Sequence, residues 1–179
     1  MMQSLDKRTE LSPRINELDF RRFQEKLHGN NPERGWDGEM FDVAVNEYKR
    51  FLELKLKYPK KTFSPTKLMD EIWHLHILDT RTYSAECDGI FGKFLHHNPS
   101  FGSWDSDFQS DRLNLSQQNL REYYSKLFPI VLVDDWNDIT PKYLENIYEK
   151  EDINWNNYDL LQFSNLFEHL QIKPYKNYK

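Results

Sequence analysis

The amino-acid sequence predicts an all-α protein, a compact multi-helix bundle with long loops and at most one short β segment. Apolar residues recur at helical spacing in several separate segments, and three of these segments begin with a Ser-Pro or Thr-Pro pair that is typical of a helix start. Only residues 130–133 read as a strand, Ile-Val-Leu-Val, and so short a run does not imply a sheet.

Two helices are expected before residue 60. Ser12-Pro13 is typical of an N-cap followed by proline at the first helical position, and Gly29 can end this helix. Asp37 can cap the second helix, which should end near Tyr58-Pro59. Its apolar stripe predicts the buried face: Phe41, Ala44, Tyr48, Phe51 and Leu52.

The middle of the chain predicts a third helix and a long loop. Ser64-Pro65 repeats the first start signal, and Asp88-Gly89 is the expected stop. A short helix over about 90–97 should follow. The stretch 98–111 is rich in Asn, Pro, Ser, Gly and Asp, so it is expected to be a loop.

Three more helices are expected in the remainder of the chain, over 116–128, from Thr140-Pro141 onward and over about 158–172. No internal repeat, low-complexity tract or convincing linker interrupts the sequence. Because 179 residues is an ordinary length for one domain, we expect a single helical domain over 1–179.

Composition narrows the class of protein. The formal charge of −5, from 24 Lys and Arg against 29 Asp and Glu, does not favour nucleic acid as a partner. The single cysteine cannot form an internal disulfide, which fits a reducing compartment. No stretch resembles a signal peptide or a membrane span. We therefore expect a soluble, cytoplasmic protein with no membrane partner.

Four of the six histidines, His74, His76, His96 and His97, fall within 24 residues of one another, and the only cysteine, Cys87, lies among them. Imidazole, carboxylate and thiolate are the side chains that bind Zn, Fe, Mn or Cu. This segment is therefore the candidate functional site.

Helical geometry separates the first two histidines. On a regular helix His74 and His76 lie about 200° apart, because each residue turns the chain by about 100°. Asp70 and His74, four residues apart, share one face. Cys87 lies roughly 16 Å beyond His76 along a straight helix, so these two could share an ion only if the helix breaks.

The leading hypothesis is a metal held by Asp70 and His74 and completed by His97 or His96. His76 then joins as a ligand through a distorted turn, or serves as a neighbouring proton-transfer group. A divalent transition metal is expected, with Zn favoured and Fe the alternative, because two histidines and one carboxylate also match non-haem Fe(II) sites. Such a protein could be a metal-dependent hydrolase or oxygenase, or it could bind metal without catalysis.

Two other interpretations stay open. In the first, the histidines are a packing device or structural-metal site in a non-enzymatic interaction module, whose aromatic C-terminal half meets a protein partner or a second copy. In the second, His96-His97-Asn98 resembles a His-Asn-His nuclease finger, but residues 116–127 carry no histidine to complete it. The substrate and the partner cannot be identified from these patterns.

Several of these residues, in this order, resemble the glycine-rich-domain-containing-protein-like family over about Trp36 to Gly102. The similar residues are Tyr48-Lys49-Arg50-Phe51-Leu52, Tyr58-Pro59, Ser64-Pro65-Thr66, Met69-Asp70-x-x-Trp73-His74-x-His76, Tyr83, Cys87 and His96-His97. Plant relatives carry a glycine-rich tail, whereas this chain has only six glycines. The resemblance implies no particular reaction. It implies one shared site, in which Trp73, Tyr83, Cys87 and His96 stand around the ligands or replace one of them.

Overall fold

The computed structural model describes residues 10–24, 26, 38–98, 106–128, 130 and 132–135. The chain divides into two compact units, Met1–Ile139 and Thr140–Lys179, and every described residue belongs to the first. The helices expected from Thr140 onward, the cap at Asp37 and the stop at Gly29 lie outside the described residues. That residues 1–179 form a single domain stays a prediction.

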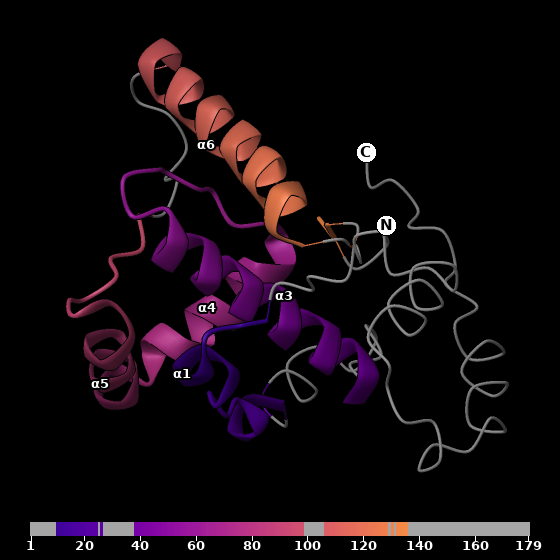
Figure 1. Ribbon diagram of the computed structural model, residues 1–179, viewed down its shortest axis with the longest axis vertical. Coiled ribbons are helices and arrows are strands. Elements are labelled where there is room, and N and C mark those ends of the chain that lie inside the picture. Colours follow the sequence, from indigo (N-terminus) through magenta and orange to yellow (C-terminus); the bar gives the residue numbers. More distant parts are fainter. Residues whose placement is uncertain are drawn as a thin grey trace, which may run out of the picture. The chain divides into compact units, whose positions relative to one another are not determined.

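The described residues form helices and no strand, which confirms the all-α fold class. In chain order the elements are α1 (Pro13–Asn16), the 3-10 turn η1 (Arg21–Phe23), α3 (Gly38–Lys57), α4 (Lys67–Leu78), α5 (Thr80–Phe91) and α6 (Ser106–Leu127). Figure 1 shows α3 running through the middle of these helices, with α1 and α4 beside it and α5 at one edge. None of the described helices combines the length and the apolar character that crossing a bilayer requires.

Helix α3 forms the centre of the core. The predicted stripe is confirmed, since Phe41, Ala44, Tyr48, Phe51 and Leu52 are all buried. These residues recur every three or four positions, which places them on one face of a helix. Helix α3 packs most extensively against α4 and also contacts α1 and α6.

Two carboxylates on α3 are fully buried, and both are hydrogen-bonded. Both Glu53 oxygens accept hydrogen bonds from Ser12, from its backbone N–H and from its hydroxyl, each at 2.8 Å. Glu47 accepts from Arg50 at 2.9 Å and from the Tyr124 hydroxyl at 2.8 Å. Because a buried carboxylate is costly without partners, these contacts tie α1 and α6 to α3.

The helix predicted from Ser12 onward is wrong after its first turn. Helix α1 begins after Ser12 with Pro13 as expected, but it ends at Asn16, and η1 follows separately. The Asp19 carboxylate accepts a hydrogen bond from the Arg21 backbone N–H at 3.0 Å, a local alternative to the helical hydrogen bond. The bend buries Phe20 against the core.

The third predicted helix is two helices. Helix α4 ends at Leu78 and α5 begins at Thr80, with Asp79 between them at φ −83° and ψ 64°. Aspartate favours helix ends because its side chain competes for local hydrogen bonds. Here the carboxylate pairs with Arg22 at 2.9 Å, and the Thr82 hydroxyl and Arg22 lower its pKa.

The expected stop at Asp88-Gly89 and the short helix over 90–97 are also wrong. Helix α5 continues through Gly89 to Phe91 and ends at Gly92, whose φ of +66° is the left-handed conformation that glycine adopts without strain. Residues 93–98 are not helical. The loop predicted over 98–111 is too long, because α6 begins at Ser106, where Ser and Asp suit a first helical turn.

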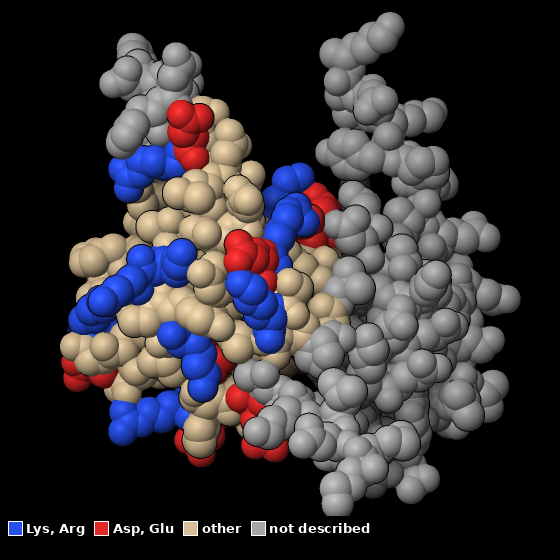
Figure 2. All heavy atoms as spheres, turned by 45° about the horizontal axis from the view of Figure 1, so that its top comes forward, with Lys and Arg blue, Asp and Glu red and all other residues tan. Residues whose placement is uncertain are grey.

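The face of the described residues drawn in Figure 2 carries both signs of charge, with Asp and Glu side chains near Lys and Arg side chains. Some of these neighbours pair directly, such as Lys67 with Asp135 at 2.8 Å and Arg121 with Asp134 at 2.6 Å.

Candidate metal centre

Helix α4 supplies the first two residues of the candidate centre. Thr66 is the N-cap, and its hydroxyl accepts a hydrogen bond from the Met69 backbone N–H at 3.3 Å, so the helix starts two residues after the predicted Ser64 cap. Asp70 and His74 lie one turn apart on the more exposed face, with His74 Nε2 3.6 Å from Asp70 Oδ2. The opposite face buries Leu68, Met69, Ile72 and Leu75.

The third residue comes from the segment after α5. Gly92 lets the chain leave the helix, and His97 then meets α4. Its Nε2 lies 2.8 Å from Asp70 Oδ1. Its ring packs edge-on against Trp73, with ring centroids 4.5 Å apart, and lies 4.8 Å from the His74 ring. The structure therefore brings Asp70, His74 and His97 together from two elements.

The spacing of these three donors suits a metal ion. One ligand atom from each of Asp70, His74 and His97 lies within 4.8 Å of the others. Ligand atoms bound to one Zn²⁺ at about 2.1 Å lie roughly 3.4 Å apart in a tetrahedron, so small rotamer changes would close the set around an ion.

The centre is embedded on one side and open on the other. The His97 side chain is 12% exposed, whereas the His74 side chain is 53% exposed. Three protein ligands with one accessible side is the arrangement of catalytic metal sites, in which the remaining position takes water or substrate. Structural zinc sites instead use four protein ligands.

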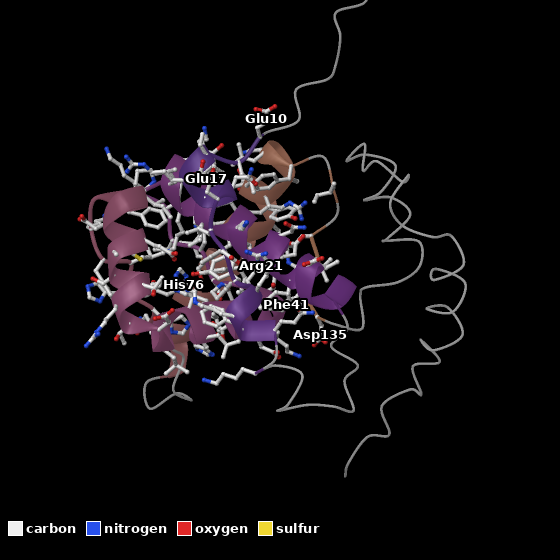
Figure 3. The ribbon with its side chains drawn as sticks, turned by 90° about the horizontal axis from the view of Figure 1, so that it is seen from below. Glu10, Glu17, Arg21, Phe41, His76 and Asp135 are labelled. Atoms are coloured by element: carbon white, nitrogen blue, oxygen red, sulfur yellow. The ribbon has the colours of Figure 1, made fainter. Side chains whose placement is uncertain are left out.

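The structure does not bring His76 to this centre. His76 is 1% exposed and lies inside the helices, where Figure 3 labels it. Its Nδ1 is 3.0 Å from the Tyr48 hydroxyl and its Nε2 is 2.5 Å from Glu86 Oε2. The rings of Phe20 and Tyr83 pack edge-on against it. Both ring nitrogens are therefore occupied by protein partners.

Burial keeps the His76 side chain uncharged near neutral pH. Loss of solvent lowers the pKa of His76 to about 4, and Arg22 adds to the shift. Burial also raises the pKa of Glu86. With a pKa of about 4, His76 is neutral at pH 7. With His76 neutral, Nε2–H donates to Glu86 and Nδ1 accepts from the Tyr48 hydroxyl.

The other predicted neighbours of the ligands are separately placed. Trp73 Nε1 donates to the Tyr83 hydroxyl at 2.9 Å, and both residues are buried. Cys87 is a buried free thiol whose pKa is raised by burial. His96 is exposed, and its ring lies 4.9 Å from the Phe94 ring. Of the two adjacent histidines, His97 is thus the one that meets Asp70.

Sequence reasoning missed Glu86, Arg22 and the backbone of Leu95. Glu86 is the partner of His76, Arg22 pairs with Asp79, and the Leu95 carbonyl accepts a hydrogen bond from the Tyr83 hydroxyl. No motif marks these residues, because each contact depends on how α4, α5 and the N-terminal segment fold together. A break signal at Asp79 would have been the only local indication.

The UCP032817-like family matches residues 13–125, well over half of the chain and all of the candidate centre. The chain belongs to the UCP032817-like family. No match was found among curated proteins or among solved structures. Membership of this family indicates no particular activity, and the resemblance to the glycine-rich-domain-containing-protein-like family stays a prediction.

Proposed function

We propose that this member of the UCP032817-like family binds one divalent transition metal through Asp70, His74 and His97. The observation that supports the proposal is the convergence of these three donors within 4.8 Å from two separate elements. Zn²⁺ is the favoured ion and Fe²⁺ the alternative, since both accept two imidazoles and a carboxylate.

Local chemistry favours the same three residues as ligands. The Asp70 carboxylate already has an imidazole nitrogen near each oxygen, at 2.8 Å and 3.6 Å. A cation between them would accept a donor atom from all three groups at once. Trp73 holds the His97 ring from the side, so this ligand needs little ordering on binding.

The accessible side of the centre supports metal-dependent chemistry at that position. A bound ion with a free coordination position can activate water or polarise a substrate oxygen. His76 would remain in the core as a neutral, hydrogen-bonded residue, because its nitrogens are engaged by Tyr48 and Glu86. We therefore assign it no role as a ligand of this ion.

One observation favours a second function, a non-enzymatic packing role. His97 bonds Asp70 at 2.8 Å and packs on Trp73, and both are direct protein contacts that fasten the segment 93–98 to α4. In that case metal would be unnecessary, and His74, which is mostly exposed, would have no comparable role.

Elemental analysis of purified, tag-free protein tests the proposal. The wild type, after reconstitution with Zn, Fe, Mn, Cu and Ni in turn, should hold about one equivalent of metal. His74→Ala should lose it while keeping its helical circular dichroism, because His74 is exposed. His96→Ala is the matched control and should keep its metal. A wild type that holds none of the five metals would contradict the proposal and favour the packing role.

A thermal melt with and without chelator then separates two kinds of site. A structural ion contributes its binding free energy to folding, so its removal should lower the melting temperature strongly. An ion with an open position and a preformed ligand set should stabilise less. Turnover assays are justified only in the second case.

A further inference from the structure

The segment that carries His97 is held by side chains of α5. The Tyr83 hydroxyl donates a hydrogen bond to the Leu95 carbonyl and accepts one from Trp73 Nε1 at 2.9 Å. Tyr83 is 1% exposed, so its hydroxyl is shielded from bulk water. The hydroxyl is thus fixed by a donor on α4 and fixes, in turn, the backbone of the returning segment.

The same backbone position has a second contact with α5. The Leu95 N–H lies against the sulfur of Cys87, which is buried four residues after Tyr83 and so on the same face of α5. Both polar backbone groups of Leu95 are therefore engaged by one helix face. Two chain residues span at most about 7 Å, so fixing Leu95 restricts where His97 can lie.

We propose that Tyr83 is a positioning residue for the metal centre: through its hydrogen bond to the Leu95 carbonyl, it holds the segment that delivers His97 to Asp70. This inference rests on the proposed function. Trp73 contacts both the positioning residue and the ligand, since its Nε1 orients the Tyr83 hydroxyl and its ring packs against His97. Burial raises the pKa of Tyr83, so the hydroxyl stays a neutral donor throughout the physiological range.

A packing role alone would need only the tyrosine ring. That ring lies edge-on against His76 and Phe94, with centroids 4.7 Å and 5.1 Å away, and phenylalanine would preserve both contacts. The hydroxyl is what Tyr83→Phe removes, and with it the Leu95 hydrogen bond and the acceptor for Trp73. This substitution therefore separates positioning from packing.

Co²⁺ titration of four proteins tests the inference: wild type, Tyr83→Phe, His97→Ala and the double variant, each titrated to millimolar metal. Removing a partner that orients a metal ligand typically weakens affinity 10–100-fold. We expect Tyr83→Phe to weaken Co²⁺ binding about tenfold. In the His97→Ala background the same change should alter affinity less than about twofold, because the ligand that Tyr83 positions is gone.

Tyr124→Phe is the matched control. Tyr124 is equally buried and its hydroxyl also makes a buried hydrogen bond, to Glu47 at 2.8 Å, but on the α3–α6 side of the core. It should cost similar stability and leave Co²⁺ affinity unchanged. An unchanged affinity in Tyr83→Phe, or an equal loss with and without His97, would overturn the positioning role.

Amide hydrogen exchange of residues 93–98 in metal-free protein keeps the two proposals distinguishable. Tyr83→Phe should raise exchange there selectively, whereas Tyr124→Phe should not. If the wild type holds neither Co²⁺ nor any of Zn, Fe, Mn, Cu and Ni, the proposed function fails, and exchange still decides whether Tyr83 holds this segment. Unchanged exchange in Tyr83→Phe would refute the claim that the Tyr83 hydroxyl restrains residues 93–98.

Discussion

Replacing His97 with alanine should destabilise the metal-free protein, whereas replacing His74 should barely affect it. Both residues are proposed ligands, but they differ in their protein contacts. His97 is largely buried and has a hydrogen bond to Asp70 and a ring contact with Trp73. His74 is mostly exposed, and its distance to Asp70 is 3.6 Å.

The expected magnitudes follow from these contacts. A hydrogen bond to a charged group contributes about 1.5–3 kcal/mol, and we take about 1 kcal/mol because Asp70 is one-third exposed. An edge-on aromatic pair adds about 0.5–1.5 kcal/mol. His97→Ala should therefore lower the free energy of unfolding by about 2 kcal/mol. An exposed ion pair one helical turn apart contributes about 0.5 kcal/mol at most, which bounds the effect of His74→Ala.

Urea denaturation in excess chelator measures this difference, with His96→Ala as the exposed neighbouring control. Metal at about 100 times its dissociation constant should then stabilise the wild type by about 2.7 kcal/mol, and both ligand variants should lose that increment. Equal destabilisation by His74→Ala and His97→Ala without metal would refute the reasoning. So would a loss of the metal increment in His96→Ala.

Three further predictions concern the elements that support the centre. Gly92→Ala should lower the free energy of unfolding by about 1 kcal/mol in urea denaturation, because alanine is strained at a φ of +66°. An added Cβ would meet no atom within 4 Å, so no clash adds to this cost, and a neutral effect would show that the turn relaxes. Thr66→Ala should cost about 1 kcal/mol in the same assay, because it removes the α4 cap, and Thr66→Ser should recover most of it. Stability should fall by up to about 2 kcal/mol as pH falls from 6.5 to 5, because unfolded His76 takes up a proton while the folded residue, with its pKa lowered to about 4, does not. The raised pKa of Glu86 acts in the opposite sense and reduces the slope, and His76→Gln should remove the slope that His76 contributes.

The part of the centre that follows from local geometry could be predicted from the sequence. Asp70 and His74 are four residues apart, so any helix through them places both on one face. The same periodicity predicted the buried stripe of α3, which is confirmed. It also predicted that His76 points away from His74, and the structure places it in the core. These statements need only the helical repeat.

The remainder depends on contacts between segments. Adjacent histidines offered no local reason to prefer His97 over His96, because the preference arises from where Gly92 and Leu95 direct the chain. The N-terminal helix was predicted too long because apolar spacing alone cannot register the hydrogen bond from Arg21 to Asp19. Glycine at position 89 was read as a stop, yet a helix tolerates it when a better left-handed position follows.

The break at Asp79 brings together two hydrogen-bonded pairs, each with one residue on α4 and one on α5. On a straight helix, residues ten apart lie about 15 Å from each other along the axis. Here two such pairs are in direct contact: Trp73 with Tyr83 at 2.9 Å, and His76 with Glu86 at 2.5 Å. The corner between α4 and α5 therefore closes around two ten-residue pairs at once.

These two pairs explain why His74 and His76, although close in sequence, have different surroundings. Tyr83 of the first pair bonds the Leu95 carbonyl, and two residues later His97 contacts Asp70 on the more exposed face of α4. The His76–Glu86 pair is enclosed by rings from the N-terminal segment and α3. A substitution that straightens the corner would separate both pairs together. Loss of metal binding and exposure of His76 should therefore occur in the same variants.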